Sequence, residues 1–357
     1  MSKHPPYAIS VSSLGEYRRE AIAILRSVFG DDLAIYASSV AIDPTVRTLK
    51  PPELGLIEAP IKQLKGLTVQ KVPMRCRLGS QVLIMDLNPR MPQVWLTTVG
   101  RRLLRKKTLL WGHAWPRKGR DSPTARVRLL LARLSDGVIT YTHTQASEVR
   151  DALPGKAVIA APNAIDREDD FLHDGGANRS YFTYVGRLVA SKRVDLLVRA
   201  FAMARLPFDV GLLLVGEGPD AASLRKLVTD LGVEGRVVFA GHVSDRRELR
   251  KVYRHTLASV SPGYVGLSLI QSLSFGVPMI YAGGEDHSPE IEAATDDNSV
   301  CFAMGDPEAL ANAMVAFYGD AASWDSRGPQ IAIRAKRTYS AETMASGLEQ
   351  ALRGSSR

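Results

Sequence analysis

YFTYVGRLVASKRVDLLVRAFAM, at residues 181–203, decides the fold of the second half of the chain. Tyr181–Val185 consists of aromatic and β-branched residues, which favour a buried strand, and Gly186 ends this run. Apolar residues then recur at three- and four-residue intervals over Arg193–Met203, which predicts an amphipathic helix. A strand that leads directly into a helix is the repeating unit of parallel sheets.

The same alternation recurs along the whole chain. In the second half we expect further strands at Gly211–Val215, Val237–Ala240, Ala258–Ser261 and Pro278–Ala282, and further helices at Ala221–Leu231, Arg246–Tyr253, Leu267–Phe275 and Pro307–Phe317. In the first half we expect strands at Tyr7–Val11, Leu33–Ala37, Val82–Asp86, Thr108–Trp111, Val138–Tyr141 and Ala157–Ala161, with helices that include Gly15–Phe29, Pro92–Leu104 and Thr124–Leu134.

A polar stretch with two adjacent glycines, Asp166–Ser180, separates the two series and predicts a linker. We therefore predict an α/β protein of two Rossmann-like doubly wound domains that face each other across a cleft. The first domain would comprise residues 1–168 and the second residues 176–335. The last segment, 336–357, would contain a helix at Ser340–Leu352 that returns to the first domain.

The positive charge of the chain is concentrated in its first half. The net charge is +9, and residues 1–170 hold 26 Lys and Arg against 16 Asp and Glu. One cationic run, Arg101-Arg-Leu-Leu-Arg-Lys-Lys107, ends the predicted helix Pro92–Leu104. An excess confined to one half indicates an anionic partner, and we expect a membrane surface rather than nucleic acid because no nucleic-acid motif is present.

Other features of the composition indicate a cytoplasmic protein. No stretch approaches the ~18 apolar residues that span a bilayer, and Met1–Pro6 lacks the apolar core of a signal peptide. Cys76 and Cys301 have no metal-type spacing and are expected to be unpaired core thiols. We expect a cytoplasmic protein, peripheral on the inner face of the plasma membrane.

Two cations follow the first strand of the second half. Arg187 and Lys192 lie five residues apart in the loop before the next helix. Fixed cations at such a position can neutralise a diphosphate leaving group without a metal ion. From spacing alone, both could equally be solvated loop residues.

Two later strands also end in glycine-rich loops. Leu214–Pro219 contains Gly216 but lacks a complete dinucleotide-binding fingerprint, so a tight turn explains it equally well. Ser261–Pro278 contains Gly263 and Gly266 before a helix, with Gln271 about one turn into it.

The three loops, in this order and spacing, resemble the family-four retaining glycosyltransferases of the GT-B fold, of the bacterial envelope or exopolysaccharide type. The resemblance covers about residues 161–320 and includes Pro162–Asp166 and Gly241–Val243. It implies that Arg187 and Lys192 hold the donor diphosphate. It also implies a donor site that includes Gly216, His242, Val243, Gly263, Gly266, Leu267, Gln271 and Glu290.

The chain departs from this family at its paired glutamates. Those positions fall on Gly263 and Gln271, so both carboxylates are absent. Gln271 could still accept one hydrogen bond from a ribose hydroxyl and donate another. Gly263 offers no side chain, and Glu290 matches a glutamate that the family often has. We expect altered recognition of the donor sugar.

The first half offers weaker candidates. His113 follows a strand within Trp111-Gly-His-Ala-Trp115, and the resemblance implies a catalytic position near the donor sugar; packing between the tryptophans is the alternative. Trp115 could stack on an acceptor sugar, and Asn88 could line the acceptor side.

We therefore predict a glycosyltransferase that moves a sugar from a nucleotide-sugar donor to a saccharide or polyprenyl-diphosphate-saccharide acceptor, with retention. Its catalytic residues would be His113, Arg187 and Lys192. No Asp-x-Asp motif is present, so neither a metal nor another cofactor is expected. The alternatives are a sugar-nucleotide epimerase and a glycosyltransferase-like binding protein that has lost catalysis and acts at the membrane.

Overall fold

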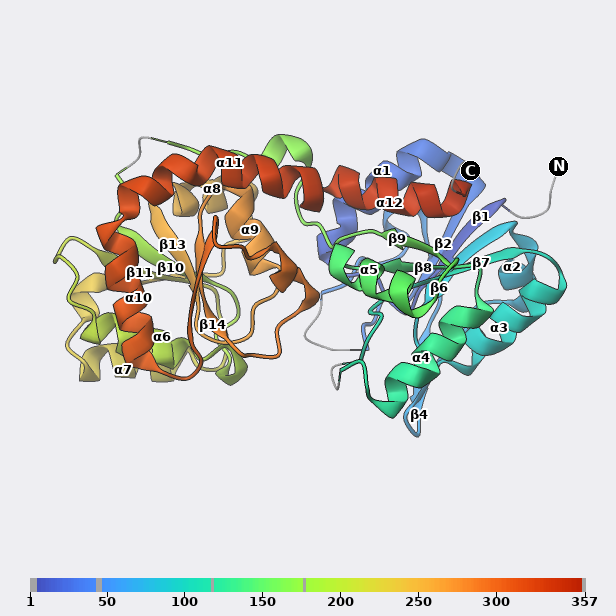
Figure 1. Cartoon of the computed structure of the whole chain (residues 1–357), viewed down its shortest axis with the longest axis horizontal. Helices are drawn as coiled ribbons and strands as arrows, with labels where there is room; N and C mark the ends of the chain where they lie inside the picture. Colours follow the sequence, from blue (N-terminus) through green and yellow to red (C-terminus); the bar gives the residue numbers. More distant parts are fainter. Residues whose placement is uncertain (1–4, 43–46, 117–118, 176–177, 355–357) are drawn as a thin grey trace. The chain divides into compact units, whose positions relative to one another are not determined.

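A computed structural model describes residues 5–42, 47–116, 119–175 and 178–354, and it divides the chain into two compact units (Figure 1). The first unit comprises Met1–Ile165 and Tyr339–Arg357, and the second comprises Asp166–Thr338. Each unit has its own parallel sheet and its own apolar core.

The first unit contains a seven-stranded parallel sheet in the order β3-β2-β1-β6-β7-β8-β9. A short antiparallel hairpin, β4–β5, lies outside this sheet. The strands are β1 (Tyr7–Ser10), β2 (Leu33–Ala37), β3 (Leu56–Glu58), β4 (Ile61–Leu64), β5 (Leu67–Gln70), β6 (Val82–Asp86), β7 (Lys107–Trp111), β8 (Gly137–Thr140) and β9 (Ala157–Ala160). Its α-helices are α1 (Arg19–Phe29), α2 (Met74–Gly79), α3 (Pro92–Leu103), α4 (Pro123–Leu134), α5 (His143–Ala152) and α12 (Ala341–Arg353).

The second unit contains a six-stranded parallel sheet in the order β12-β11-β10-β13-β14-β15. Its strands are β10 (Tyr181–Val185), β11 (Gly211–Val215), β12 (Val237–Gly241), β13 (Thr256–Ser261), β14 (Met279–Gly283) and β15 (Ser299–Ala303). Its α-helices are α6 (Val194–Met203), α7 (Ala221–Asp230), α8 (Arg246–Arg254), α9 (Ser268–Ser274), α10 (Pro307–Gly319) and α11 (Ala321–Tyr339), the last of which ends at the unit boundary.

The predicted α/β class with two doubly wound sheets is confirmed. Every predicted strand begins and ends within two residues of an observed one, because continuous apolar runs are typical of strands buried on both faces. The prediction did not include the hairpin β4–β5, whose residues are mostly exposed, nor β3, α2, α5, β15 and α11.

The C-terminal helix completes the core of the first unit. Met344, Leu348 and Leu352 of α12 are fully buried in the same apolar cluster as Ile22 and Leu25 of α1. Helix α12 therefore supplies one wall of a core whose other elements lie far earlier in the sequence.

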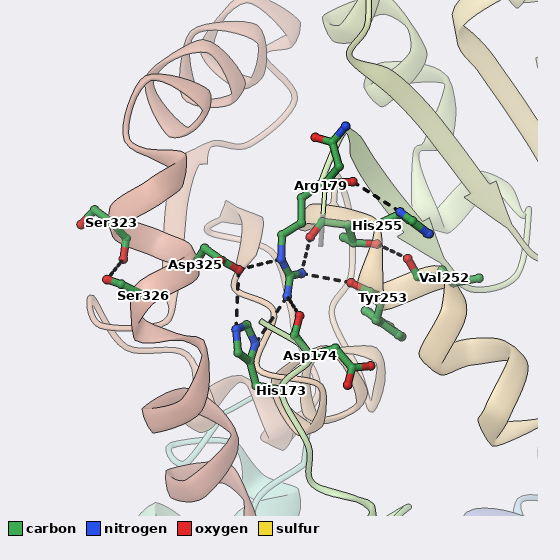
Figure 2. A network of polar contacts seen from close by, with 11 residues as sticks. His173, Asp174, Arg179, Val252, Tyr253, His255, Ser323, Asp325 and Ser326 are labelled. Carbon is green, nitrogen blue, oxygen red and sulfur yellow. Dashed lines mark hydrogen bonds and ion pairs between the residues drawn. The ribbon is translucent and has the colours of Figure 1, made fainter. Parts of the chain in front are cut away.

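The predicted linker is firmly attached to the second unit. Figure 2 shows His173, Asp174 and Asp325 gathered around Arg179. The Arg179 guanidinium forms an ion pair of 2.7 Å with Asp325 of α11 and donates to the backbone oxygens of Tyr253 and Thr256 at 3.1 and 2.7 Å. The described part of Asp166–Ser180 is thus bound to α8, β13 and α11 rather than free.

Two expectations from the sequence are wrong. Cys301 is exposed rather than part of a core, although both cysteines are free. Arg101, part of the cationic run expected to meet an anionic partner, is fully buried. Its guanidinium donates to the backbone oxygens of Arg77 and Lys107 at 2.6 and 2.7 Å, so it fastens α3 to neighbouring loops.

Lys106 of the same run is also structural. Its ammonium donates to the backbone oxygens of Leu78 and Gly79 at 2.6 and 2.8 Å. Arg102, Arg105 and Lys107 are exposed. Among the described residues, no helix has both the length and the apolar character needed to cross a bilayer.

Candidate active site

In the second unit, β10 and β13 are parallel neighbours. Strands β11 and β12 are added on one side of this pair and β14 and β15 on the other, so the order of the strands reverses between β10 and β13. Open α/β sheets bind ligands at such a switch point, beyond the carboxyl ends of the strands. The loop with Arg187 and Lys192 follows β10, and the loop with Gly263 and Gly266 follows β13. The structure therefore brings the first and third sequence motifs together.

Lys192 connects these two loops. Its ammonium donates to the backbone oxygen of Tyr264 at 2.6 Å and lies 4.2 Å from the centre of the Tyr264 ring. Burial, together with the nearby charge of Arg187, lowers the pKa of Lys192 to about 8. This lysine is thus a desolvated cation that an anionic ligand could stabilise.

Arg187 differs from Lys192 in being exposed. Its guanidinium makes no hydrogen bond or ion pair with any residue in the described ranges, while its backbone oxygen accepts from the Tyr184 hydroxyl at 2.7 Å. Two neighbouring cations that have no carboxylate partner in the described part of the chain make this loop a suitable site for a diphosphate.

Gly216 and Gly218 of the second motif have a steric reason to be glycines. A Cβ atom at Gly216 would lie 1.8 Å from the backbone oxygen of Gly186, and one at Gly218 would lie 2.1 Å from that of Leu188. The loop after β11 therefore packs backbone to backbone against the loop of Arg187. This packing explains the glycines whether or not a ligand touches Gly216.

Gly263 also lies against backbone. A Cβ atom there would be 2.9 Å from the Ser191 oxygen and 3.1 Å from the Lys192 carbonyl carbon. The loop of Lys192 thus occupies the space that a side chain at Gly263 would need. Gly263 is thus held in tight packing between the two loops.

Gln271 lies in α9, and its Oε1 accepts from the Tyr253 hydroxyl at 3.3 Å. The Tyr253 ring is stacked on Phe275, with centroids 4.6 Å apart, so the contact holds Gln271 against a rigid surface. The amide oxygen has a second lone pair and the amide nitrogen has two N–H groups, so Gln271 can both accept from and donate to a ligand.

The other predicted donor-site residues surround this loop. Gly266 and half-buried Leu267 precede α9, and Glu290 is buried in the short 3-10 helix Pro289–Ala293. His242 is exposed just after β12, and Val243 packs against the apolar cluster of Leu249 and Tyr253. The contacts of these residues with a donor stay a prediction.

In the first unit, the switch point lies between β1 and β6. Asp86 ends β6 and accepts from the Ser12 amide at 2.6 Å, and burial raises the pKa of Asp86 to about 6. Beside it, the buried Arg18 lies 4.6 Å from the Trp111 ring and 4.9 Å from the Tyr141 ring.

The sequence does not point to Arg18 as a site residue, and it points to Asp86 only as the start of the segment Asp86–Arg90 that could line the acceptor side. Arg18 donates to Asn163 at 3.0 Å, so it joins the loops after three different strands. In the sequence, Arg18 is marked only by its place in the loop after the first strand, close to Gly15. Its aromatic neighbours come from distant positions that only the fold reveals.

His113 lies exposed at the carboxyl edge of the same sheet, with its ring 4.8 Å from that of Tyr141. Arg128 donates to the backbone oxygens of His113 and Leu87 at 2.7 and 3.0 Å and so fixes two adjacent loops. The structure therefore places His113 where a ligand could reach it.

Trp115 and Asn88 make local contacts. The Trp115 indole donates to Glu148 at 2.5 Å, and the Arg120 guanidinium lies 5.1 Å from its ring. The Asn88 side chain accepts from the Arg90 amide at 3.0 Å within its own turn. Roles for either residue with an acceptor remain predictions.

Two doubly wound units with polar loops at their switch points are the parts from which a GT-B fold is built. Consistent with this, the chain is similar to the solved structure of Anabaena HepE in complex with UDP, with a TM-score of 0.68 at 15% identity over 97% of this chain and 99% of that one. In sequence, residues 179–320 match the family described as "Glycosyl transferases group 1". This match lies entirely within the second unit.

Two curated bacterial relatives extend the match. The chain is 34% identical over 56% of its length to the lipopolysaccharide core biosynthesis glycosyltransferase LpsE of Rhizobium meliloti, and covers 58% of that protein. It is 28% identical over 52% of its length to the N-acetyl-alpha-D-glucosaminyl L-malate synthase of Bacillus anthracis, and covers 51% of it. The chain therefore spans little more than half the length of these relatives.

Proposed function

We propose that this protein is a glycosyltransferase that moves a sugar, with retention, from a nucleotide-sugar donor to a saccharide acceptor in bacterial envelope or exopolysaccharide synthesis. The observation that carries the proposal is the pair Arg187 and Lys192 at the switch point of the second unit, where neither cation has a carboxylate partner among the described residues. The family match over residues 179–320 and the similarity to LpsE, a lipopolysaccharide core biosynthesis glycosyltransferase, support it.

The chemistry assigned to this pair is electrostatic. As the bond between sugar and diphosphate breaks, negative charge grows on the leaving phosphate, and fixed cations stabilise that charge. An oxygen of the leaving phosphate accepts the proton of the acceptor hydroxyl on the same face of the sugar. The protein's share is mainly positioning and charge stabilisation, and neither a metal nor a cofactor is assigned a role.

We assign a UDP-sugar as the first donor class to test, because the similar HepE structure was solved with UDP. We propose a saccharide carried on a polyprenyl diphosphate as the acceptor, used at the cytoplasmic face of the membrane. The malate synthase shows by its name that a relative uses a different acceptor, so the acceptor is assigned separately from the donor.

The donor assignment is tested by thermal denaturation with UDP-, GDP-, TDP- and ADP-sugars. One nucleotide class should raise the melting temperature by about 5 °C or more at a concentration one hundredfold above Kd. Arg187→Ala should abolish this shift without lowering the melting temperature of the free protein, because the Arg187 side chain is exposed and makes no hydrogen bond or ion pair with the described residues.

Arg199→Ala, an exposed arginine on α6, is the matched control and should keep the shift. A shift that survives in Arg187→Ala, or no shift with any nucleotide sugar, would refute the donor site. Lys192→Ala tests the donor site less directly, because the contact of Lys192 with Tyr264 also holds the loop after β13.

A binding protein without catalysis is the second candidate. The close packing at Gly263 favours it, because no carboxylate can enter there without moving the loop of Lys192. The two functions differ in turnover: a transferase releases nucleoside diphosphate when donor and acceptor are mixed, whereas a binding protein shows the thermal shift alone.

A further inference from the structure

Helix α3 has an inverted distribution of apolar and polar side chains. Its buried residues include Thr97, Thr98 and Arg101, whereas Leu96 and Leu103 are 68% and 81% exposed. Leu96, Val99 and Leu103 recur at helical spacing, so they form one outward stripe. A helix that only had to fold against its own sheet would bury its leucines and expose its threonines.

The neighbouring helix α4 also carries exposed apolar side chains. Val127 and Leu130 of α4 are also exposed, and α3 contacts α4 along the same side of the sheet of the first unit (Figure 1). We call the surface formed by Leu96, Val99, Leu103, Val127 and Leu130 the α3–α4 face. Exposed apolar side chains gathered on adjacent helices indicate an interaction site.

Charge indicates what this face contacts. Residues 87–135 contain 12 Lys and Arg and a single acidic residue, Asp121. Arg102 of α3 and Arg126 and Arg133 of α4 are exposed next to the apolar positions, and neither helix contains a carboxylate. A second copy seated here by two-fold symmetry would bring these cations together and be repelled.

We propose that the α3–α4 face docks on an anionic lipid bilayer, with its apolar stripe in the headgroup region and its arginines on the lipid phosphates. Interfacial binding of helices uses this combination of apolar burial and attraction to anionic lipid. The inference builds on the lipid-linked acceptor proposed above, because docking would hold the first unit at the surface where such an acceptor lies. It does not depend on the donor site.

The test is sedimentation of the full chain with vesicles of phosphatidylcholine alone or mixed with phosphatidylglycerol. Binding should need the anionic lipid and weaken with salt. Leu103→Asp should lower the apparent partition coefficient at least tenfold, because an apolar side chain of this size gains at least about 1.5 kcal/mol on full burial. Phe208→Asp, at an 85% exposed position of the second unit, is the matched control and should bind like the wild type.

A second pair of variants tests the cations. Arg126→Gln with Arg133→Gln should lower binding about 30-fold, from about 1 kcal/mol for each cation near an anionic surface. Arg199→Gln with Arg205→Gln, both exposed in the second unit, should have little effect. Variants of Arg101 and Lys106 are avoided, since these side chains hold the fold.

Three results would overturn the proposal: no binding to anionic vesicles, equal loss in both arginine pairs, or a dimer in solution that Leu103→Asp dissociates. The last result would make the α3–α4 face a self-association surface. The thermal shift with nucleotide sugars should be the same in Leu103→Asp as in the wild type. Vesicle binding without any nucleotide shift would therefore contradict the proposed donor site and leave the docking surface standing.

Discussion

At the scale of single residues, the loop cations are better defined by their environment than by their spacing. Arg187 and Lys192 look equivalent in the sequence, yet one is exposed and the other is bound to Tyr264. Whether a lysine is desolvated depends on what the rest of the chain packs over it, which local sequence does not contain. The same holds for Gly263, because the backbone of Ser191 leaves no room there for a side chain.

Lys192 leads to a prediction about protons. Its pKa is about 8 in the free protein, and a bound diphosphate should raise it by supplying the missing opposite charge. Near pH 8, where about half of the Lys192 side chains are neutral, donor binding should therefore take up protons. Calorimetric titrations in two buffers with different ionisation enthalpies measure this uptake.

In Lys192→Arg, whose side chain stays protonated, the uptake should disappear while some binding remains. An uptake of the same size in this variant would assign the proton to another group. A binding enthalpy that is independent of buffer in the wild type would contradict a donor contact at Lys192.

At the scale of elements, strands and helices were predictable because their apolar periodicity is local. Strand β5 of the hairpin does alternate, but its apolar Leu67 and Val69 are the exposed residues. Helix α3 likewise buries polar residues, so in both elements burial opposes the pattern. Arg101 reads as part of a cationic surface run, but its length and five donors let it reach four backbone oxygens from inside. The aromatic surroundings of Arg18 likewise require the assembled sheet.

The network around Arg179 gives a prediction on pH. Burial first, and then the charge of Arg179, lower the pKa of His173 from its ordinary value of 6.5. The unfolded chain therefore binds more protons at this residue than the folded chain, and stability falls as the pH drops through about 6.5. Below the pKa of the folded state this contribution no longer changes.

Urea unfolding of the wild type and of His173→Gln, between about pH 7.5 and pH 5, isolates this contribution. The wild type should lose stability relative to the variant on acidification, by at most about 1.4 kcal/mol per pH unit. Parallel curves for the two proteins would show that His173 does not titrate differently on folding. Asp86, whose pKa is raised, acts in the opposite direction and cancels in the comparison.

At the scale of the whole molecule, the chain forms two units, and one of them is discontinuous in sequence. The two doubly wound sheets were predictable from repeated strand–helix units. Contacts of a ligand with either sheet were not, because they depend on side chains from several loops at once. The donor side is the better supported, since the family match falls on the second unit.

The discontinuity predicts separate responses of the two units to mutation. Leu348→Ala in α12 removes a fully buried side chain from the core of the first unit, and should destabilise that unit by about 2–5 kcal/mol. Leu310→Ala does the same in the second unit. In calorimetry, Leu310→Ala should lower the unfolding temperature of the second unit and Leu348→Ala that of the first. Donor nucleotide should raise the unfolding temperature of the second unit and leave that of the first unchanged.

If both variants lowered the same unfolding temperature by the same amount, the two units would unfold as one. A nucleotide effect on the transition lowered by Leu348→Ala would place the donor on the first unit instead.

The place of α12 in the first unit also has a consequence during translation. Ile22 and Leu25 leave the ribosome early, but the wall that covers them, at Met344 and Leu348, is made only after the entire second unit. At about 5–20 residues per second, the nascent first unit waits on the order of ten to forty seconds with part of its core uncovered. During that interval it is a natural client for a ribosome-associated chaperone, whereas the second unit is complete as soon as α11 emerges.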